Sequence, residues 1–159
     1  MSDLLAVPAW LDDALYKCRV LYGRNIERVE FEAYAPRSVR SLQLVEVGGL
    51  DYKHKYADRT GLNALFAQRG HADDVLMVRD GLITDASYAN VAFFDGQNWL
   101  TPAQPLLEGT RRAKLITEGK VIPKKISADN LSGFVCARLM NAMLDFDTTP
   151  TIDIAAIAF

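Results

Sequence analysis

Two tight turns in the middle of the chain constrain its fold more than any other feature of the sequence. Asp80-Gly81 and Asp95-Gly96 each separate two apolar runs. Asp-Gly pairs supply the positive backbone angles that tight hairpin turns require. The flanking runs are therefore predicted to form two antiparallel hairpins, over residues 75–78 with 82–84 and residues 90–94 with 99–101.

Three more runs, nearer the start of the chain, also have the composition of strands. Residues 15–22 and 29–33 alternate apolar and polar side chains, as half-solvated strands do. Residues 39–47 are rich in valine and leucine and are followed by Gly48-Gly49, a natural break. Their short connections predict one antiparallel sheet. We expect a small first lobe over residues 1–47 and a second lobe over residues 48–159.

Two helices are predicted from apolar spacing and terminal glycines. Residues 60–69 carry apolar side chains at helical spacing and are followed by Gly70, a favourable residue after a helix C-terminus. Gly109 is expected to open a second helix near residues 111–118, which Gly119 closes. Strands combined with few helices predict an α+β chain. The tail after Asp145 shows no clear pattern.

Composition argues against several kinds of partner. The 159 residues carry a formal net charge of −2 with no basic stripe, so nucleic acid is not expected to bind. No apolar run is long enough to span a bilayer, and residues 1–10 lack the basic and apolar regions of a signal peptide. A cytoplasmic protein that does not engage membranes is expected. The two cysteines and two histidines lack metal-ligand spacing, so no metal site is expected.

Three motifs, far apart in sequence, carry the functional interpretation. The first is a lysine followed after two residues by an acid and an arginine, and the second is an acid separated by four residues from an asparagine. The third is Thr-Pro, a leucine-rich approach, and a glycine that opens a helix with an arginine in its first turn. The matching residues are Lys55, Asp58 and Arg59, then Asp85 and Asn90, then Thr101, Pro102, Gly109 and Arg112.

In this order and spacing, the motifs resemble the class IV aminotransferase and 4-amino-4-deoxychorismate lyase family of pyridoxal 5'-phosphate (PLP) enzymes. The resemblance implies the cofactor lobe of PLP fold type IV, with Lys55 as the Schiff-base lysine on a strand. Lysine reacts with an aldehyde only as the neutral amine, so its site has to disfavour the charged form. Lys53 would share that strand face and is the alternative reactive lysine.

The same resemblance assigns the remaining cofactor contacts. Asp85 would hold the ring nitrogen protonated, in a place where most family members carry glutamate, and Asn90 would tie down its loop. Gly109, Thr110 and Arg111 would bind the phosphate, since a helix N-terminus offers free N–H groups and the positive end of the helix dipole. Asn141 would face the phosphate from the end of the final predicted strand, residues 134–140, although it is also typical of a turn at a strand end.

The family normally begins with a strand and a helix that supply an arginine to the phosphate site. Nothing in this sequence matches that segment, so a truncated first lobe and weakened PLP binding are expected. Asn141-Ala142 and Arg59 favour a lyase that releases pyruvate and leaves 4-aminobenzoate. A D- or branched-chain amino acid transaminase and a degenerate, non-catalytic member remain alternatives. The expected partners are a small amino-acid-like substrate and a second copy of the chain.

Overall fold

The computed structural model describes residues 7–158, and the expectations for residues 1–6 lie outside the described part. The chain divides after Arg37 into two compact units. The first contains an antiparallel hairpin of β1 (Tyr16–Tyr22) and β2 (Ile26–Ala33), as the alternating pattern predicts. Between residues 7 and 158, no helix is long and apolar enough to cross a membrane.

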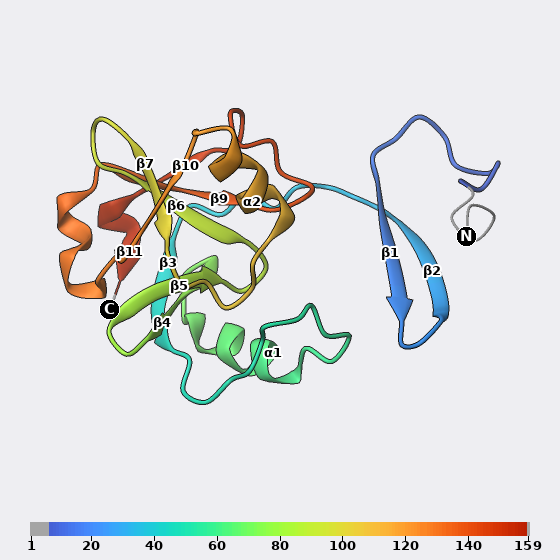
Figure 1. Ribbon diagram of the computed structural model, residues 1–159, viewed down its shortest axis with the longest axis horizontal. Coiled ribbons are helices and arrows are strands. Elements are labelled where there is room, and N and C mark those ends of the chain that lie inside the picture. The colour runs from blue at the N-terminus through green and yellow to red at the C-terminus, as the bar shows by residue number, and fades with distance from the viewer. Residues whose placement is uncertain (1–6, 159) are drawn as a thin grey trace. The chain divides into compact units, whose positions relative to one another are not determined.

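The second unit is built on two sheets (Figure 1). One has the order β11-β3-β4-β5, with β3 (Leu42–Glu46), β4 (Asp74–Arg79), β5 (Leu82–Ala86) and β11 (Ile157–Ala158). The other has the order β10-β9-β6-β7-β8, with β6 (Asn90–Phe94), β7 (Trp99–Pro102), β8 (Ile122–Lys124), β9 (Cys136–Met140) and β10 (Thr151–Asp153).

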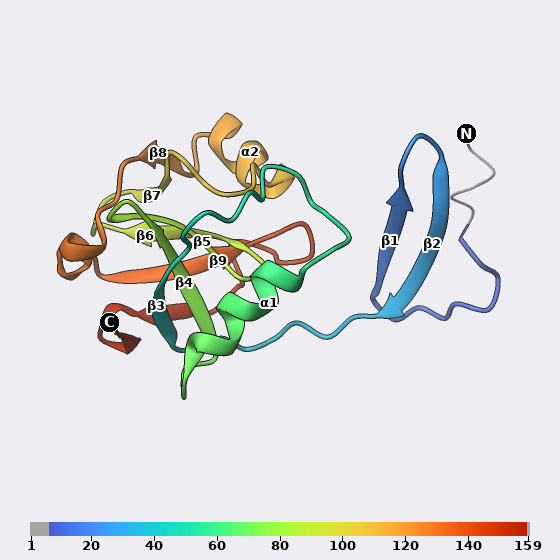
Figure 2. The same ribbon diagram turned by 90° about the horizontal axis from the view of Figure 1, so that it is seen from below.

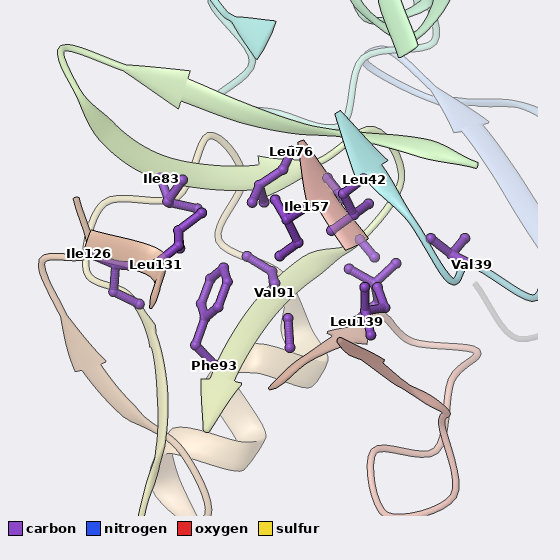
Figure 3. Close-up of a cluster of buried hydrophobic side chains, with 14 of the residues drawn as sticks. Val39, Leu42, Leu76, Ile83, Val91, Phe93, Ile126, Leu131, Leu139 and Ile157 are labelled. Atoms are coloured by element: carbon purple, nitrogen blue, oxygen red, sulfur yellow. The ribbon is translucent and has the colours of Figure 1, made fainter. Parts of the chain in front are cut away.

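The main hydrophobic core lies between these two sheets. Leu42, Leu76 and Ile83 point inward from one sheet, and Val91, Phe93 and Leu139 from the other (Figure 3). Because successive side chains of a strand point to opposite faces, β4 and β6 each have a second face that must also be covered. Both strands are almost fully buried, so both faces are covered.

Two helices cover these outer faces. The helix α1 (Thr60–Phe66) lies beside β4 (Figure 2). Its Leu62 and Leu65 pack on the outer face of β3 and β4, in one cluster with Val75 and Met77. The helix α2 (Thr110–Thr117) packs Leu115 against Ala92 of β6 and Met140 of β9. The layer order is therefore helix, sheet, sheet, helix, with short 3-10 turns at Ala67–Arg69, Ala128–Gly133 and Ile154–Ala156.

Both predicted hairpins are confirmed. β4 pairs with β5 and β6 with β7, in each case antiparallel. Asp80 and Gly81 have φ values of 51° and 74°, the positive angles that a tight turn needs, and Gly96 has a φ of 95°. The helical segments also end at the glycines, as predicted. Gly70 and Gly119 have φ values of 57° and 69°, positive angles that glycine adopts readily after a helix.

One expectation for the strands is wrong, and the tail after Asp145 has a structure that its sequence pattern does not predict. β3 was expected in one antiparallel sheet with β1 and β2, but it lies in the second unit and pairs parallel with β4. The chain divides into compact units after Arg37, and the lobe boundary expected at residue 47 stays a prediction. The tail after Asp145 is well structured, since β10 pairs with β9 and β11 pairs parallel with β3. These pairings join residues too distant in sequence for a local pattern to reveal.

Candidate active site

A cavity of about 280 Å³ in the second unit brings the motifs together. Its walls come from the segment before α1, the β5–β6 connection, the loop between β7 and α2, and the chain just after β9. The residues predicted from sequence all line it: Lys55, Asp85, Asn90, Gly109, Thr110, Arg111 and Asn141. Segments as far apart as residues 55 and 141 thus form one site.

Asp85 reaches this cavity from an irregular part of β5. Leu76 pairs with Ala86 and Val78 with Ile83, so two steps along β4 correspond to three along β5. The extra residue is a β-bulge, and bulges change the direction in which a strand presents its side chains. Ile83 points into the core between the sheets, whereas Asp85 lines the cavity.

Asp85 is only 4% exposed, and its carboxylate accepts three hydrogen bonds. Oδ1 accepts one from Asn90 Nδ2 at 2.6 Å. Oδ2 accepts two from the backbone N–H groups of Leu106 and Leu107, at 2.7 and 3.0 Å. A carboxylate has about four lone-pair positions, so one acceptor position remains, on Oδ1.

Burial raises the pKa of Asp85 to about 6, because removal from water disfavours the charged form. The hydrogen bonds from Asn90, Leu107 and Leu106, together with the positive charge of Arg112, oppose this rise. At neutral pH the side chain is therefore mainly an ionised carboxylate inside a largely apolar wall.

Asn90 and Gly109 touch closely beside this carboxylate. Asn90 Nδ2 donates to Leu107 O at 2.8 Å as well as to Asp85. A Cβ atom built on Gly109 would clash with Asn90 Oδ1. The close contact with Asn90 therefore requires a glycine at position 109, which explains the glycine of the third motif by packing.

The N-terminus of α2 forms another part of the wall. Gly109 is its N-cap residue and has no side chain to bond the first N–H groups of the helix. Its carbonyl accepts from Ala113 N, so the N–H groups of Thr110, Arg111 and Arg112 precede the first intrahelical bond. The buried Arg112 donates through Nη2 to Pro102 O at 2.8 Å, which holds the first turn against the end of β7.

Lys55 lies in an irregular segment rather than in the predicted strand. Its side chain is exposed and lines the cavity. The segment is fixed on both sides of it, because Tyr52 is buried against α1 and Arg59 reaches across the site. Arg59 donates to Tyr52 Oη at 3.3 Å and to Ser87 O at 2.9 Å.

The structure bears on two alternatives that the sequence left open. These are the choice of Lys53 as the reactive lysine and the role of Asn141 as a phosphate contact or a turn residue. Lys53 does not line the cavity, and its Nζ lies 3.5 Å from Asp51 Oδ2. Asn141 lines the cavity, but its Oδ1 accepts from the N–H groups of Met143 and Leu144 at 2.8 and 3.1 Å. Asn141 thus makes the turn contacts typical of a strand end, and its Nδ2 lies 3.5 Å from Tyr88 O.

Sequence reasoning did not single out several groups that build the site. These are the backbone N–H groups of Leu106 and Leu107, the carbonyl of Ser87, and the side chains of Tyr52 and Tyr88. Backbone groups leave no mark on residue type, so no sequence signal could have found them. Tyr52, three residues before Lys55, could have been suspected as the apolar anchor of its segment.

Comparison with known proteins agrees with this arrangement. Residues 21–146 match the amino-transferase class IV family. An uncharacterised protein of Haemophilus influenzae is 36% identical over 143 residues, which cover 90% of this chain and 76% of that protein.

Two solved structures have similar folds. One is a protein of Haemophilus somnus 129PT assigned provisionally as a 4-amino-4-deoxychorismate lyase, with 36% identity and a TM-score of 0.78, covering 82% of this chain and 68% of that one. The other, from Mesorhizobium loti, is assigned provisionally as an amino-acid aminotransferase. It has 22% identity and a TM-score of 0.70, covering 91% of this chain and 72% of that one. The chain therefore belongs to the class IV aminotransferase family and has an α+β fold of type IV.

Proposed function

We propose that the protein is a PLP-dependent lyase that acts like aminodeoxychorismate lyase, releasing pyruvate from an amino-acid-like substrate. One observation carries the proposal: a single cavity is lined by Lys55, by the buried carboxylate of Asp85 and by the N-terminus of α2. The similarity to the Haemophilus somnus protein, whose provisional assignment is this activity, supports the choice of a lyase.

The residues present fit the cofactor. The remaining acceptor position on Asp85 Oδ1 suits the N–H of a protonated ring nitrogen, which a nearby carboxylate stabilises. The N–H groups at the start of α2 and the Thr110 hydroxyl suit a phosphate, because the helix dipole adds to the hydrogen bonds. Lys55 provides an amine at the same cavity.

When bound, PLP supplies an electron sink for the electrons of a broken bond. Asp85 would keep the ring nitrogen protonated, and the α2 N-terminus would hold the phosphate end. Lys55 Nζ would first hold the cofactor and then move a proton between substrate atoms, as a positioned general acid and base. Arg59 keeps the Lys55 segment close to the β5–β6 connection.

The test is to add PLP to the purified protein and follow its absorption spectrum. A band that shifts on binding and disappears with borohydride is expected from the wild type and from Lys53→Ala, but not from Lys55→Ala. Lys53 is the matched control, because it is exposed like Lys55 but lies outside the cavity wall. No such band at saturating PLP would favour a non-catalytic family member.

A second measurement is needed to distinguish a lyase from a transaminase. A lyase releases pyruvate from aminodeoxychorismate without a keto-acid acceptor, whereas a transaminase requires the acceptor. Pyruvate release that depends on an added keto acid, or turnover of D- or branched-chain amino acids alone, would contradict the lyase. We propose a homodimer as the working form, which sedimentation of the PLP-treated protein would test.

A further inference from the structure

The loop between β7 and α2 has to be held in place for the α2 N-terminus to bind anything. Its last part, residues 106–109, runs along the cavity wall and ends at the N-cap Gly109. Leu106 is buried and contacts the cluster beneath α1, but Leu107 is only partly buried. Apolar packing therefore secures one end of this loop better than the end next to the helix.

Polar contacts to Asp85 and Asn90 secure the rest. Asp85 Oδ2 accepts from the N–H groups of Leu106 and Leu107, and Asn90 Nδ2 donates to the Leu107 carbonyl. Asp85 also accepts from Asn90, so the two side chains orient each other. Through the contact between Asn90 Oδ1 and Gly109, the same pair abuts the helix N-cap.

We infer that Asp85 is a positioning residue for the turn that opens α2, in addition to its proposed place at the ring nitrogen. Two acceptor positions of its carboxylate serve the turn, one serves Asn90, and one remains on a side chain that lines the cavity. One side chain thereby links the ring end and the phosphate end of the site. This inference rests on the proposed function only for the identity of the ligand that the turn binds. The positioning role itself rests on the hydrogen bonds.

Asparagine and glutamate at position 85 both test the positioning role. Asp85→Asn keeps the shape but places an NH₂ group against the N–H groups of Leu106 and Leu107 or against Asn90, so one set of bonds is lost. Asp85→Glu keeps the charge, but its extra methylene displaces the carboxylate from those N–H groups. Both variants should loosen the turn if Asp85 positions it.

The first readout is hydrogen exchange of residues 104–110 in the whole chain without cofactor. We expect exchange about tenfold faster or more in Asp85→Asn and Asp85→Glu, the effect of losing a hydrogen bond to a charged group. Thr101→Val is the matched control. It removes a buried hydrogen bond from Thr101 Oγ1 to Val91 O outside the cavity wall, so the turn should exchange as in the wild type.

The second readout is calorimetric binding of inorganic phosphate and of pyridoxine 5'-phosphate, which lacks the aldehyde. A positioning role predicts that both bind about tenfold more weakly to the two variants than to Thr101→Val. Unchanged exchange of residues 104–110, or faster exchange with unchanged phosphate affinity, would overturn the inference. If wild-type protein bound neither probe, the proposed cofactor site would fail, and the exchange rates would still decide whether Asp85 holds the turn.

Discussion

Asp85 and Asn90 belong to different sheets, yet Asn90 Nδ2 lies 2.6 Å from Asp85 Oδ1. Asp85 is at the bulged end of β5, and Asn90 is the first residue of β6. Their contact closes the short connection between the two sheets and directs both side chains at the turn before α2. A buried polar contact of the site thus lies where the chain passes from one sheet to the other.

Gly109→Ala should destabilise the protein. The new methyl group would overlap Asn90 Oδ1, and overpacking of this kind costs about 1–3 kcal/mol. Urea unfolding followed by circular dichroism would measure the loss. Gly49→Ala is the control, because nothing lies within contact distance of a Cβ at that position. Equal effects of the two substitutions would contradict the close approach of Gly109 and Asn90.

The stability of the protein should depend on the ionisation of Asp85. Burial raises the pKa of this carboxyl from 3.8 to about 6, so the folded chain binds the proton more tightly than the unfolded chain. The contribution of Asp85 to the free energy of unfolding is therefore greatest below pH 3.8, falls as the pH rises to about 6, and is constant above that. The rise in pKa corresponds to a change of about 3 kcal/mol in the free energy of unfolding across this pH range.

This pH dependence can be isolated with Asp85→Asn, which has no titrating group at the position. The free energy of unfolding of the wild type minus that of the variant should decrease between pH 4 and pH 7, as measured by urea titration. A difference that stayed flat or increased over this range would show that the folded state does not raise the pKa of Asp85.

Arg59→Lys should loosen the segment that carries Lys55. Lysine keeps the charge but lacks the two-pronged guanidinium that reaches both Tyr52 Oη and Ser87 O. Exchange of amide hydrogens over residues 51–59 should become about tenfold faster. Arg69→Lys is the matched control, since Arg69 contacts Phe66 within its own turn, through the Phe66 carbonyl and ring. Similar exchange rates of residues 51–59 in both variants would contradict the proposal that Arg59 holds this segment in place.

Phe93→Ala should be the more costly of two neighbouring substitutions in β6. Phe93 is fully buried between the sheets, and removal of such a ring costs about 3–5 kcal/mol. Phe94→Ala should cost less, because Phe94 lies on the other face, is partly exposed and packs against Trp99. Chemical unfolding of the two variants compares them directly. A larger loss for Phe94→Ala would contradict the proposed division of the strand's two faces.

Local features of the fold were predictable because they depend on residues close in sequence. Asp80-Gly81 adopts its turn wherever the hairpin lies, and Gly70 ends the helical segment through its own backbone freedom. The three motifs were also recognisable, because each has its own spacing of residue types, and they supply part of the cavity wall.

The sequence by itself determined the hairpins, the helix ends and the residue types that could bind a cofactor, since these follow from short-range backbone preferences and side-chain chemistry. Only the tertiary structure decided that β3 pairs parallel with β4 and β11, that a bulge turns Asp85 toward the cavity, and that Lys55 lies outside any strand. The physical reason is that these features result from packing between distant segments, where burial of two sheets against each other outweighs local preference.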